Sequence, residues 1–598
     1  MLLFIEGSGT FQLINAGYNS EPSKVLVDGS HRNDCGRSCS ITAGGNHQIT
    51  VQFNNIITSW DIMFQDIGSI KKIDLSNFIS NSVTTMVSMF QRCSNLETVI
   101  FGNIDVSSIT TMFFSFESCH SLISIDFSNM VFTNLNRMIR TFQSCISLVS
   151  VNLQNIQLTS LEDMTSTFQG CTSLNSIDFS SLDFPKLRIG YGIFLDCTNL
   201  EYVNFGDIKT PSLTTLGVLF QGCTKLKSVD ISHFNFTLVT DMDFMFLNCH
   251  NLEHVEFGDI NTLSLESMNE MFRFCYALSS VDLSNFDTSK VKNMKSVFEG
   301  CSSLESIDLW TTPTSSLEQI SSLFSGCSSL TSVELSTFIT NNVNDFSFAF
   351  NGCSNIASLD ATGFVTSSAT NMQFMFNGCS KVASLDVSHF YTSNVENMQF
   401  MFNGCSSLPT LDVAHFVTNR VTTMQSMFGG CSNLNPLDVS TFDTSEVTTM
   451  ESMFEGCSNL KSLNLLNFAN TKVTNLKKLF FGCVNLESLD ISHFKTPQVV
   501  DMSFMFFDCQ KLESLDISHF STSKVTTMNT MFYNCLKLKN INFGNIDTSN
   551  VEDMQFLFQD CKSLESLDLS HFVTSNVKFM KMMFFALPKI KTLDLSNF

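Results

Sequence analysis

The sequence predicts an α/β repeat solenoid of about 21 coils of 26 residues behind a β-rich amino-terminal cap. Nineteen cysteines, from Cys93 to Cys561, recur every 26 residues without an insertion or deletion. A phenylalanine recurs at the same interval through all 21 coils, from Phe64 to Phe584. A chain that keeps one period over most of its length is a stack of equivalent units that share a continuous core.

Composition agrees with a folded stack and limits its partners. The chain has 598 residues, of which 43% are apolar and 15% are charged, so it can bury a large core. Lys and Arg number 33 against 56 Asp and Glu, which gives a net charge of −23. An acidic surface repels phosphate backbones and anionic lipids, so we expect neither nucleic acid nor a membrane as partner.

The first half of each coil predicts a parallel strand. We count coil positions from the cysteine as position 0, so the coil of Cys379 has Leu385 at position 6 and Val387 at position 8. A spacing of two is typical of a strand and turns both side chains inward. Positions 5, 7 and 9 should then face outward, and neighbouring strands should lie about 4.8 Å apart.

The second half of each coil predicts a short helix. Apolar residues at positions 16, 19, 22 and 23 have the spacing of one helix face, and Thr392 and Ser393 precede them where a hydroxyl can cap free amides. Gly, Asp or Asn usually precedes the cysteine, as at Gly378, and these residues tolerate the left-handed conformation that ends a helix. Helices need more room than strands, so the stack should curve with the sheet inside; if the segments are instead tight single turns, the stack should be straighter.

The cysteine column is expected to consist of reduced, buried thiols. Ile67 and Leu587 take the cysteine position in the first and last coils, so the site accepts a small apolar group. Strands about 4.8 Å apart hold equivalent β-carbons too far apart for a relaxed disulfide.

Residues 1–56 do not fit the period, and residues 57–598 form the predicted solenoid. Alternation such as Ile49-Thr50-Val51-Gln52-Phe53 predicts strands that cap the first coil. Cys35 and Cys39 could form a bridge or bind metal, although two further metal ligands are not evident. No secretory signal, membrane span or carboxyl-terminal cap is recognisable in the sequence, so a second molecule could cover the last coil.

The repeat resembles a known family. The strings Met401-Phe402-Asn403-Gly404-Cys405-Ser406-Ser407-Leu408 and Ser566-Leu567-Asp568-Leu569-Ser570 are similar to BspA-like leucine-rich repeats of surface proteins. The resemblance covers roughly residues 57–598. It implies a curved leucine-rich-repeat solenoid and a role in adhesion or surface recognition, and it supplies no catalytic residues.

Position 7 provides the candidate binding site. It is Asp in 14 of the 21 coils and Glu in two more. Neighbouring carboxylates about 5 Å apart repel by roughly 1 kcal/mol in water, so the row should have raised pKa values, gather cations or bond to flanking hydroxyls such as Ser384 and Ser388. Two aromatic residues, Tyr202 and Trp310, interrupt the small polar face and are candidate binding hot spots. The residues that we expect to bind a partner are Asp282, Asp308, Trp310, Glu334, Asp360, Asp386, Asp412 and Tyr202.

Catalytic and metal motifs are weak. His250 and His254 have the spacing of an inverted zinc motif, but they fall on the turn into a strand, where the two rings would not converge. Asp490, Ser492 and His493 resemble a hydrolase triad. The same trio recurs in other coils, so we interpret it as a structural feature of the repeat and not as a catalytic site. We therefore expect no enzyme activity, metal or cofactor.

The predicted function is non-enzymatic binding or adhesion, in which the acidic Ser/Asp face meets a basic or cell-surface protein. The alternative is a structural protein that assembles head to tail with its own copies through the carboxyl-terminal coil. The resemblance implies a cell-surface location, whereas the absence of a recognisable signal or anchor favours the cytoplasm.

Overall fold

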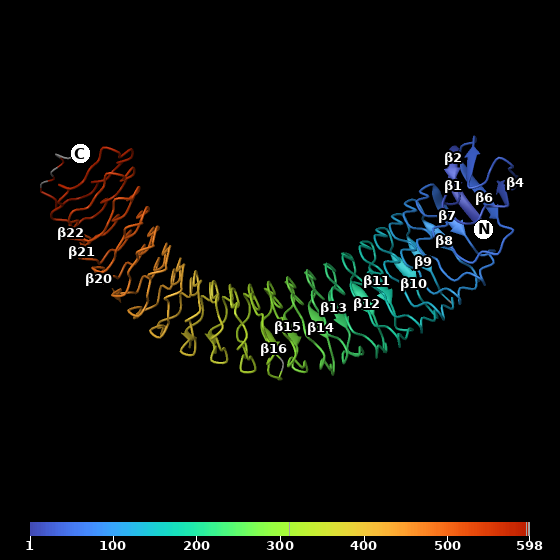
Figure 1. The fold of residues 1–598 in the computed structure, drawn as a ribbon, viewed down its shortest axis with the longest axis horizontal. Coiled ribbons are helices and arrows are strands. Elements are labelled where there is room, and N and C mark those ends of the chain that lie inside the picture. Colours follow the sequence, from blue (N-terminus) through green and yellow to red (C-terminus); the bar gives the residue numbers. More distant parts are fainter. Residues whose placement is uncertain (129, 310, 592, 594, 596–597) are drawn as a thin grey trace. The chain divides into compact units, whose positions relative to one another are not determined.

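A computed structural model describes residues 1–598 except 129, 310, 592, 594, 596 and 597 (Figure 1). The chain forms two compact units, which we call the first unit (residues 1–291 and 307–312) and the second unit (residues 292–306 and 313–598). Within each unit, successive 26-residue stretches form successive coils, which confirms the predicted repeat solenoid.

The amino-terminal strands continue directly into the first coils. They are β1 (Leu2–Glu6), β2 (Gly9–Gln12), β3 (Lys24–Val27), β4 (Ser30–His31), β5 (Ser38–Ile41) and β6 (Asn46–Gln52). β1 pairs antiparallel with both β6 and the first solenoid strand β7 (Ile70–Asp74), within a sheet of order β4-β3-β6-β1-β7-β8. The open edge of β7 is thus hydrogen-bonded by β1, as a cap requires. In the β5 region Cys35 and Cys39 form a disulfide, the first of the two roles considered for them.

Most of the coils that follow contain one short strand each. The solenoid strands are β8 (Thr98–Ile100), β9 (Ser124–Asp126), β10 (Ser150–Asn152), β11 (Ser176–Asp178), β12 (Tyr202–Asn204), β13 (Ser228–Asp230), β14 (His254–Glu256), β15 (Ser280–Asp282), β16 (Ser306–Asp308), β17 (Ser358–Leu359), β18 (Ser384–Leu385), β19 (Ser462–Asn464), β20 (Ser488–Asp490), β21 (Ser514–Asp516) and β22 (Asn540–Asn542). Pairs such as β13–β14 and β21–β22 are parallel with a register of 26 residues. In β15 the central residue is buried and both neighbours are exposed, so the predicted inward position 6 and outward positions 5 and 7 are confirmed.

The short helix predicted for each coil is wrong, because the segment is a series of tight turns. Phe400 and Gly404, at positions 21 and 25, have φ values of +56° and +75°, which a right-handed helix does not accommodate. The N–H of Met401 bonds to Met398 three residues back, but the N–H of Phe402 bonds to the carbonyl of Met427 in the next coil at 2.9 Å. Alternate amides thus bond within the coil and between coils. The described residues contain no helix at all, and hence none that is long and apolar enough to pass through a lipid bilayer.

The phenylalanines at position 23 form a buried column through the core. Phe402 is fully buried, and its ring stacks on those of Phe376 and Phe428 with centroids 5.8 Å apart on each side. The same stacking recurs in the first unit, for example between Phe142 and Phe168 at 5.4 Å. Van der Waals contact between identical rings therefore links each coil to the next.

The cysteines line the core beside this column, and the prediction of buried thiols is confirmed. The thiol of Cys405 donates a hydrogen bond to the carbonyl oxygen of Phe376, 29 residues earlier, at 3.3 Å, and Cys93 makes the equivalent bond at 3.0 Å. Desolvation by burial raises the pKa of the Cys431 and Cys483 thiols to about 12. These groups therefore stay protonated and unreactive at neutral pH.

The capping role predicted for Thr392 is wrong, since its hydroxyl bonds to another coil. Thr392 is 2% exposed; its Oγ1 donates to the carbonyl of Val417 at 3.0 Å and accepts the N–H of Val417 at 2.7 Å. Thr366 and Thr418, at the same position 13, make the same pair of bonds to the coils that follow them. The buried hydroxyl at position 13 is satisfied in this way, together with both polar backbone groups of one residue in the next coil.

Candidate binding surfaces

The outward carboxylates at position 7 are held by the backbone that follows the strand. Asp386 Oδ1 accepts the N–H of Ser388 at 2.9 Å, and Asp360 and Glu334 accept the equivalent amides at 3.0 and 2.9 Å. Where position 7 is asparagine the bond is kept, as between Asn464 Oδ1 and the N–H of Leu466 at 3.2 Å. The side chain at position 7 thus closes a turn in addition to facing solvent.

The expectation that mutual repulsion raises these pKa values is wrong for nine of the aspartates. Hydrogen bonds from the side chain and the backbone amide of the residue two positions later lower the pKa of the carboxyl group. The nine are Asp74, Asp230, Asp282, Asp360, Asp386, Asp438, Asp490, Asp516 and Asp568. Bonding to the neighbouring hydroxyl and amide, one of the three outcomes considered from the sequence, is the one found here.

Because these pKa values are lower in the folded chain than in the unfolded chain, the protein should lose stability in acid. The stabilisation is present above about pH 4, the usual aspartate pKa, and is lost as the pH falls through the lower folded-state pKa values. We expect the melting temperature, followed by circular dichroism, to fall steeply between about pH 4 and pH 2.5. A melting temperature that stays constant over this range would contradict the assignment.

The predicted site residues fall in both units. Tyr202, Asp282 and Asp308 belong to the first unit, whereas Glu334, Asp360, Asp386 and Asp412 belong to the second, and Trp310 lies outside the described residues. In the second unit the carboxylates occupy consecutive coils, and Asp438 extends the row to five. Asp438 was missed, although the same position-7 rule identifies it. We call Glu334, Asp360, Asp386, Asp412 and Asp438 the acidic row.

The acidic row is exposed and has small, uncharged neighbours. All five carboxylate residues are exposed, and the residues at positions 4, 5 and 9 of these coils are Ala, Pro, Asn, Ser or Thr. Next to Asp412 and Asp438 the surface is hollowed by a cavity of about 480 Å³, whose lining includes Thr410, Pro436 and Asn464. No basic side chain at these positions neutralises the row.

Tyr202 lies at a pocket of about 370 Å³ in the first unit, together with His233, His254 and Glu256. The Tyr202 side chain is 55% exposed. His254 Nε2 lies 3.5 Å from Glu256 Oε2, while His250 packs against the ring of Tyr276 at 5.0 Å. His250 and His254, which have the spacing of an inverted zinc motif, thus contact different neighbouring residues. Among the described residues, no cluster of three or more His, Cys, Asp or Glu side chains could hold a metal ion.

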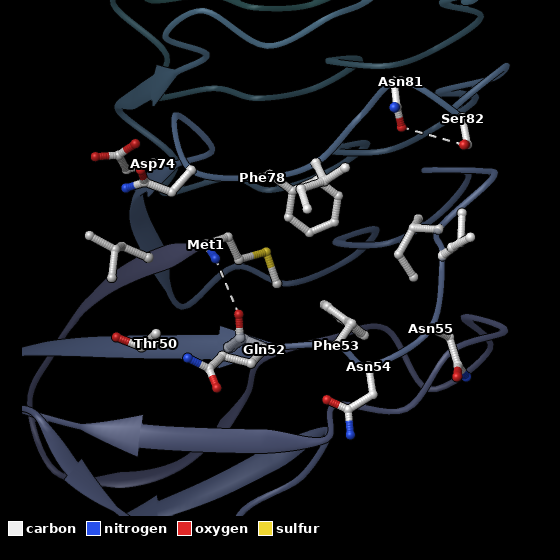
Figure 2. Close-up of a pocket in the computed structure, with 16 residues that line it drawn as sticks. Met1, Thr50, Gln52, Phe53, Asn54, Asn55, Asp74, Phe78, Asn81 and Ser82 are labelled. Atoms are coloured by element: carbon white, nitrogen blue, oxygen red, sulfur yellow. Dashed lines mark hydrogen bonds between the residues drawn. The ribbon is translucent and has the colours of Figure 1, made fainter.

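A cavity of about 740 Å³ lies where the cap meets the first coil (Figure 2). Phe53 and Phe78 pack edge to face at 6.3 Å beside it, and the amides of Asn54, Asn55 and Asn81 lie around it. Sequence reasoning missed this cavity, because it depends on how the non-repetitive cap packs on the loop after β7. Its lining combines apolar side chains and amides with the amino group of Met1 and the carboxylate of Asp74.

Comparison with known proteins agrees with the repeat. The family described as "Mycoplasma protein of unknown function, DUF285" matches residues 58–181, 214–338, 305–409, 371–468, 459–544 and 514–598. The BspA type leucine-rich repeat region matches residues 138–265. A search of the curated proteins gives no match.

Solved structures with similarity to the chain include leucine-rich repeat proteins of low identity. One from Bacteroides ovatus is 22% identical over 71% of this chain and 84% of that chain, with a TM-score of 0.38. An internalin from Listeria monocytogenes is 14% identical over 59% of this chain and 89% of that chain, with a TM-score of 0.20. The plant peptide hormone receptor RGFR1, in complex with RGF2, is 11% identical over 89% and 92% of the two chains, with a TM-score of 0.20.

The DUF285 matches extend over most of the solenoid, and the BspA-type match lies within the first unit. With its 26-residue coils and position-0 cysteines, the chain belongs to the DUF285 family, and its repeats are BspA-type leucine-rich repeats.

Proposed function

We propose that the protein is a non-enzymatic binding solenoid whose acidic row receives a basic surface of another protein. Adhesion at a cell surface is the context that the BspA resemblance favours. The observation that carries the proposal is the row of five exposed carboxylates on consecutive coils of the second unit, from Glu334 to Asp438.

The charge and spacing of the acidic row determine which kind of protein surface could pair with it. The lowered pKa values of Asp360, Asp386 and Asp438 keep these groups ionised throughout the physiological range. Their backbones repeat at the strand spacing of about 4.8 Å, so a partner needs several Lys or Arg side chains in a line to pair with them. Such a surface would gain association rate and specificity from complementary charge, and both would weaken in salt.

The chain offers a conservative variant that tests this proposal. Asparagine replaces aspartate naturally at position 7, at Asn152 and Asn464, and keeps the hydrogen bond to the amide two residues later. A variant with Asp360, Asp386, Asp412 and Asp438 all changed to Asn should therefore lose four charges and keep its fold.

The probe is a labelled decalysine peptide, with binding followed by fluorescence anisotropy at low and raised salt. Exposed ion pairs contribute about 0.2–1 kcal/mol each, so we expect the four changes together to weaken binding by about fourfold or more. The matched control changes Asp126, Asp178, Asp230 and Asp490, which lie at position 7 outside the acidic row, to Asn, with the same loss of net charge. Equal weakening in both variants would mean that only overall charge matters and would overturn the proposal.

Light scattering across protein concentration separates this function from the alternative. A binding module stays at a small, defined size, whereas head-to-tail assembly through the last coil predicts open-ended growth. Particles that lengthen with concentration would favour the structural function.

A further inference from the structure

The turn side of the second unit carries a patch without charges, on coils whose strand side carries the acidic row. Positions 20, 21 and 24 of five consecutive coils, from Ser321 to Gly429, hold only Ser, Gln, Phe, Asn or Gly, and the last four of these coils carry the stacked rings and amides. We define the neutral patch by Ser347, Phe348, Asn351, Gln373, Phe374, Asn377, Gln399, Phe400, Asn403, Gln425, Ser426 and Gly429. Charges return at the same positions at Lys295 and Glu299 on one side and at Glu451 and Glu455 on the other.

Aromatic rings form the centre of the patch. The rings of Phe348 and Phe374 stack with centroids 4.7 Å apart, and those of Phe374 and Phe400 with centroids 4.5 Å apart. All three side chains are partly exposed. Because each inner ring face is covered by the next ring, the column offers its ring edges to a partner and leaves no open face there for a flat ligand.

Amide columns lie on both sides of the rings. Asn403 Nδ2 donates to Asn377 Oδ1, and Asn377 Nδ2 donates to Asn351 Oδ1, both at 2.7 Å. On the other side Gln399 Nε2 donates to Gln373 Oε1 at 2.7 Å. Each primary amide has a second N–H, so the columns can still bond outward.

We propose that the neutral patch is the surface through which a second copy of this chain docks side by side. Aromatic and amide columns that repeat at one coil spacing are the elements that interdigitate between paired sheets in steric zippers. A partner must share that spacing to match several coils at once, and a second copy does so by construction.

Electrostatics favours the same occupant. Two copies with a net charge of −23 repel each other over most of their surface, so they can approach closely only where charge is absent. Another partly exposed aromatic column of the second unit, Phe481, Phe507 and Tyr533, is adjoined by Asp508 and Asp560 and lacks this property. An isologous pair through the neutral patch would leave both acidic rows free for the partner proposed above.

Sedimentation velocity of the full chain tests the proposal. We expect a reversible dimer with a midpoint of roughly 10–100 μM, in the range of weak interfaces, and more dimer in 1 M salt because salt screens the repulsion. The double variant Phe374→Ser with Phe400→Ser should remain monomeric at concentrations at which the parent dimerises. Serine already occupies position 21 at Ser426 and Ser452, so the coil tolerates it.

Two further variants make the outcome decisive. Phe507→Ser removes a stacked ring from the column beside carboxylates and should leave the dimer unchanged. Tyr533→Ser, in the same column, should likewise leave the dimer unchanged. A parent chain that stays monomeric at about 100 μM, or equal loss of dimer in Phe507→Ser, would overturn the proposal.

Discussion

Replacing Phe402 by alanine should lower the free energy of unfolding of the second unit by about 3–5 kcal/mol. The side chain is fully buried and touches an identical ring in the coil before and in the coil after it. Alanine would leave a cavity between two rings whose backbones are fixed by hydrogen bonds, so the site cannot collapse around the smaller residue. Guanidinium denaturation followed by circular dichroism measures the loss.

The matched control for this substitution is Phe400→Ser, two residues away on the partly exposed turn. Its cost should stay near 1 kcal/mol, because serine occupies that position in other coils. In a one-dimensional stack, loss of one contact between neighbours can also split unfolding into two transitions. A Phe402→Ala variant that unfolds like the parent would show that the ring column is not what couples the coils.

Replacing Gly404 by valine should cost about 2–3 kcal/mol. Gly404 has a φ of +75°, which costs an L-residue about 1–2 kcal/mol and a β-branched residue more. A β-carbon at this position would also lie 3.4 Å from the Cα of Gly378 in the preceding coil. Chemical denaturation again gives the difference.

Asparagine is the control at this glycine. Asn248 and Asn534 occupy position 25 in other coils with φ values of +62° and +60°. Gly404→Asn should therefore cost less than about 1 kcal/mol. If valine and asparagine prove equally costly, contact with Gly378 and not backbone strain would be the cause.

The period, the strand and the left-handed residue before the cysteine could be predicted because each leaves a local signal in the sequence. Two inward side chains two residues apart identify the strand at Leu385, and Gly378 signals a positive φ. The turn segment, whose alternate amides bond within the coil and to the next coil, leaves no such signal in the sequence. Positive φ at position 21 is carried by residues such as Phe400 and Ser322, which do not favour it, and the neighbouring coil stabilises it through hydrogen bonds.

The candidate site likewise has some properties that the sequence predicts and others that it does not. Alternation along the strand was enough to predict that Asp386 faces outward. Its lowered pKa depends on the geometry of the turn at Ser388, and the pocket of Tyr202 gathers His233 and His254 from successive coils. Contacts between coils decide these properties, and a pattern read along the chain does not contain them.

The hydrogen bonds of Thr392 to the next coil have a consequence for how the length of such a protein can change. Its hydroxyl engages the N–H and C=O of Val417, whichever side chain that residue carries, so the junction between two coils is generic. A whole block of 26 residues could be gained or lost, and the flanking coils would meet through the same bonds. A block one residue shorter would misplace the donors and acceptors of that coil against its neighbours, so whole 26-residue blocks are the units in which length can change while these bonds are kept.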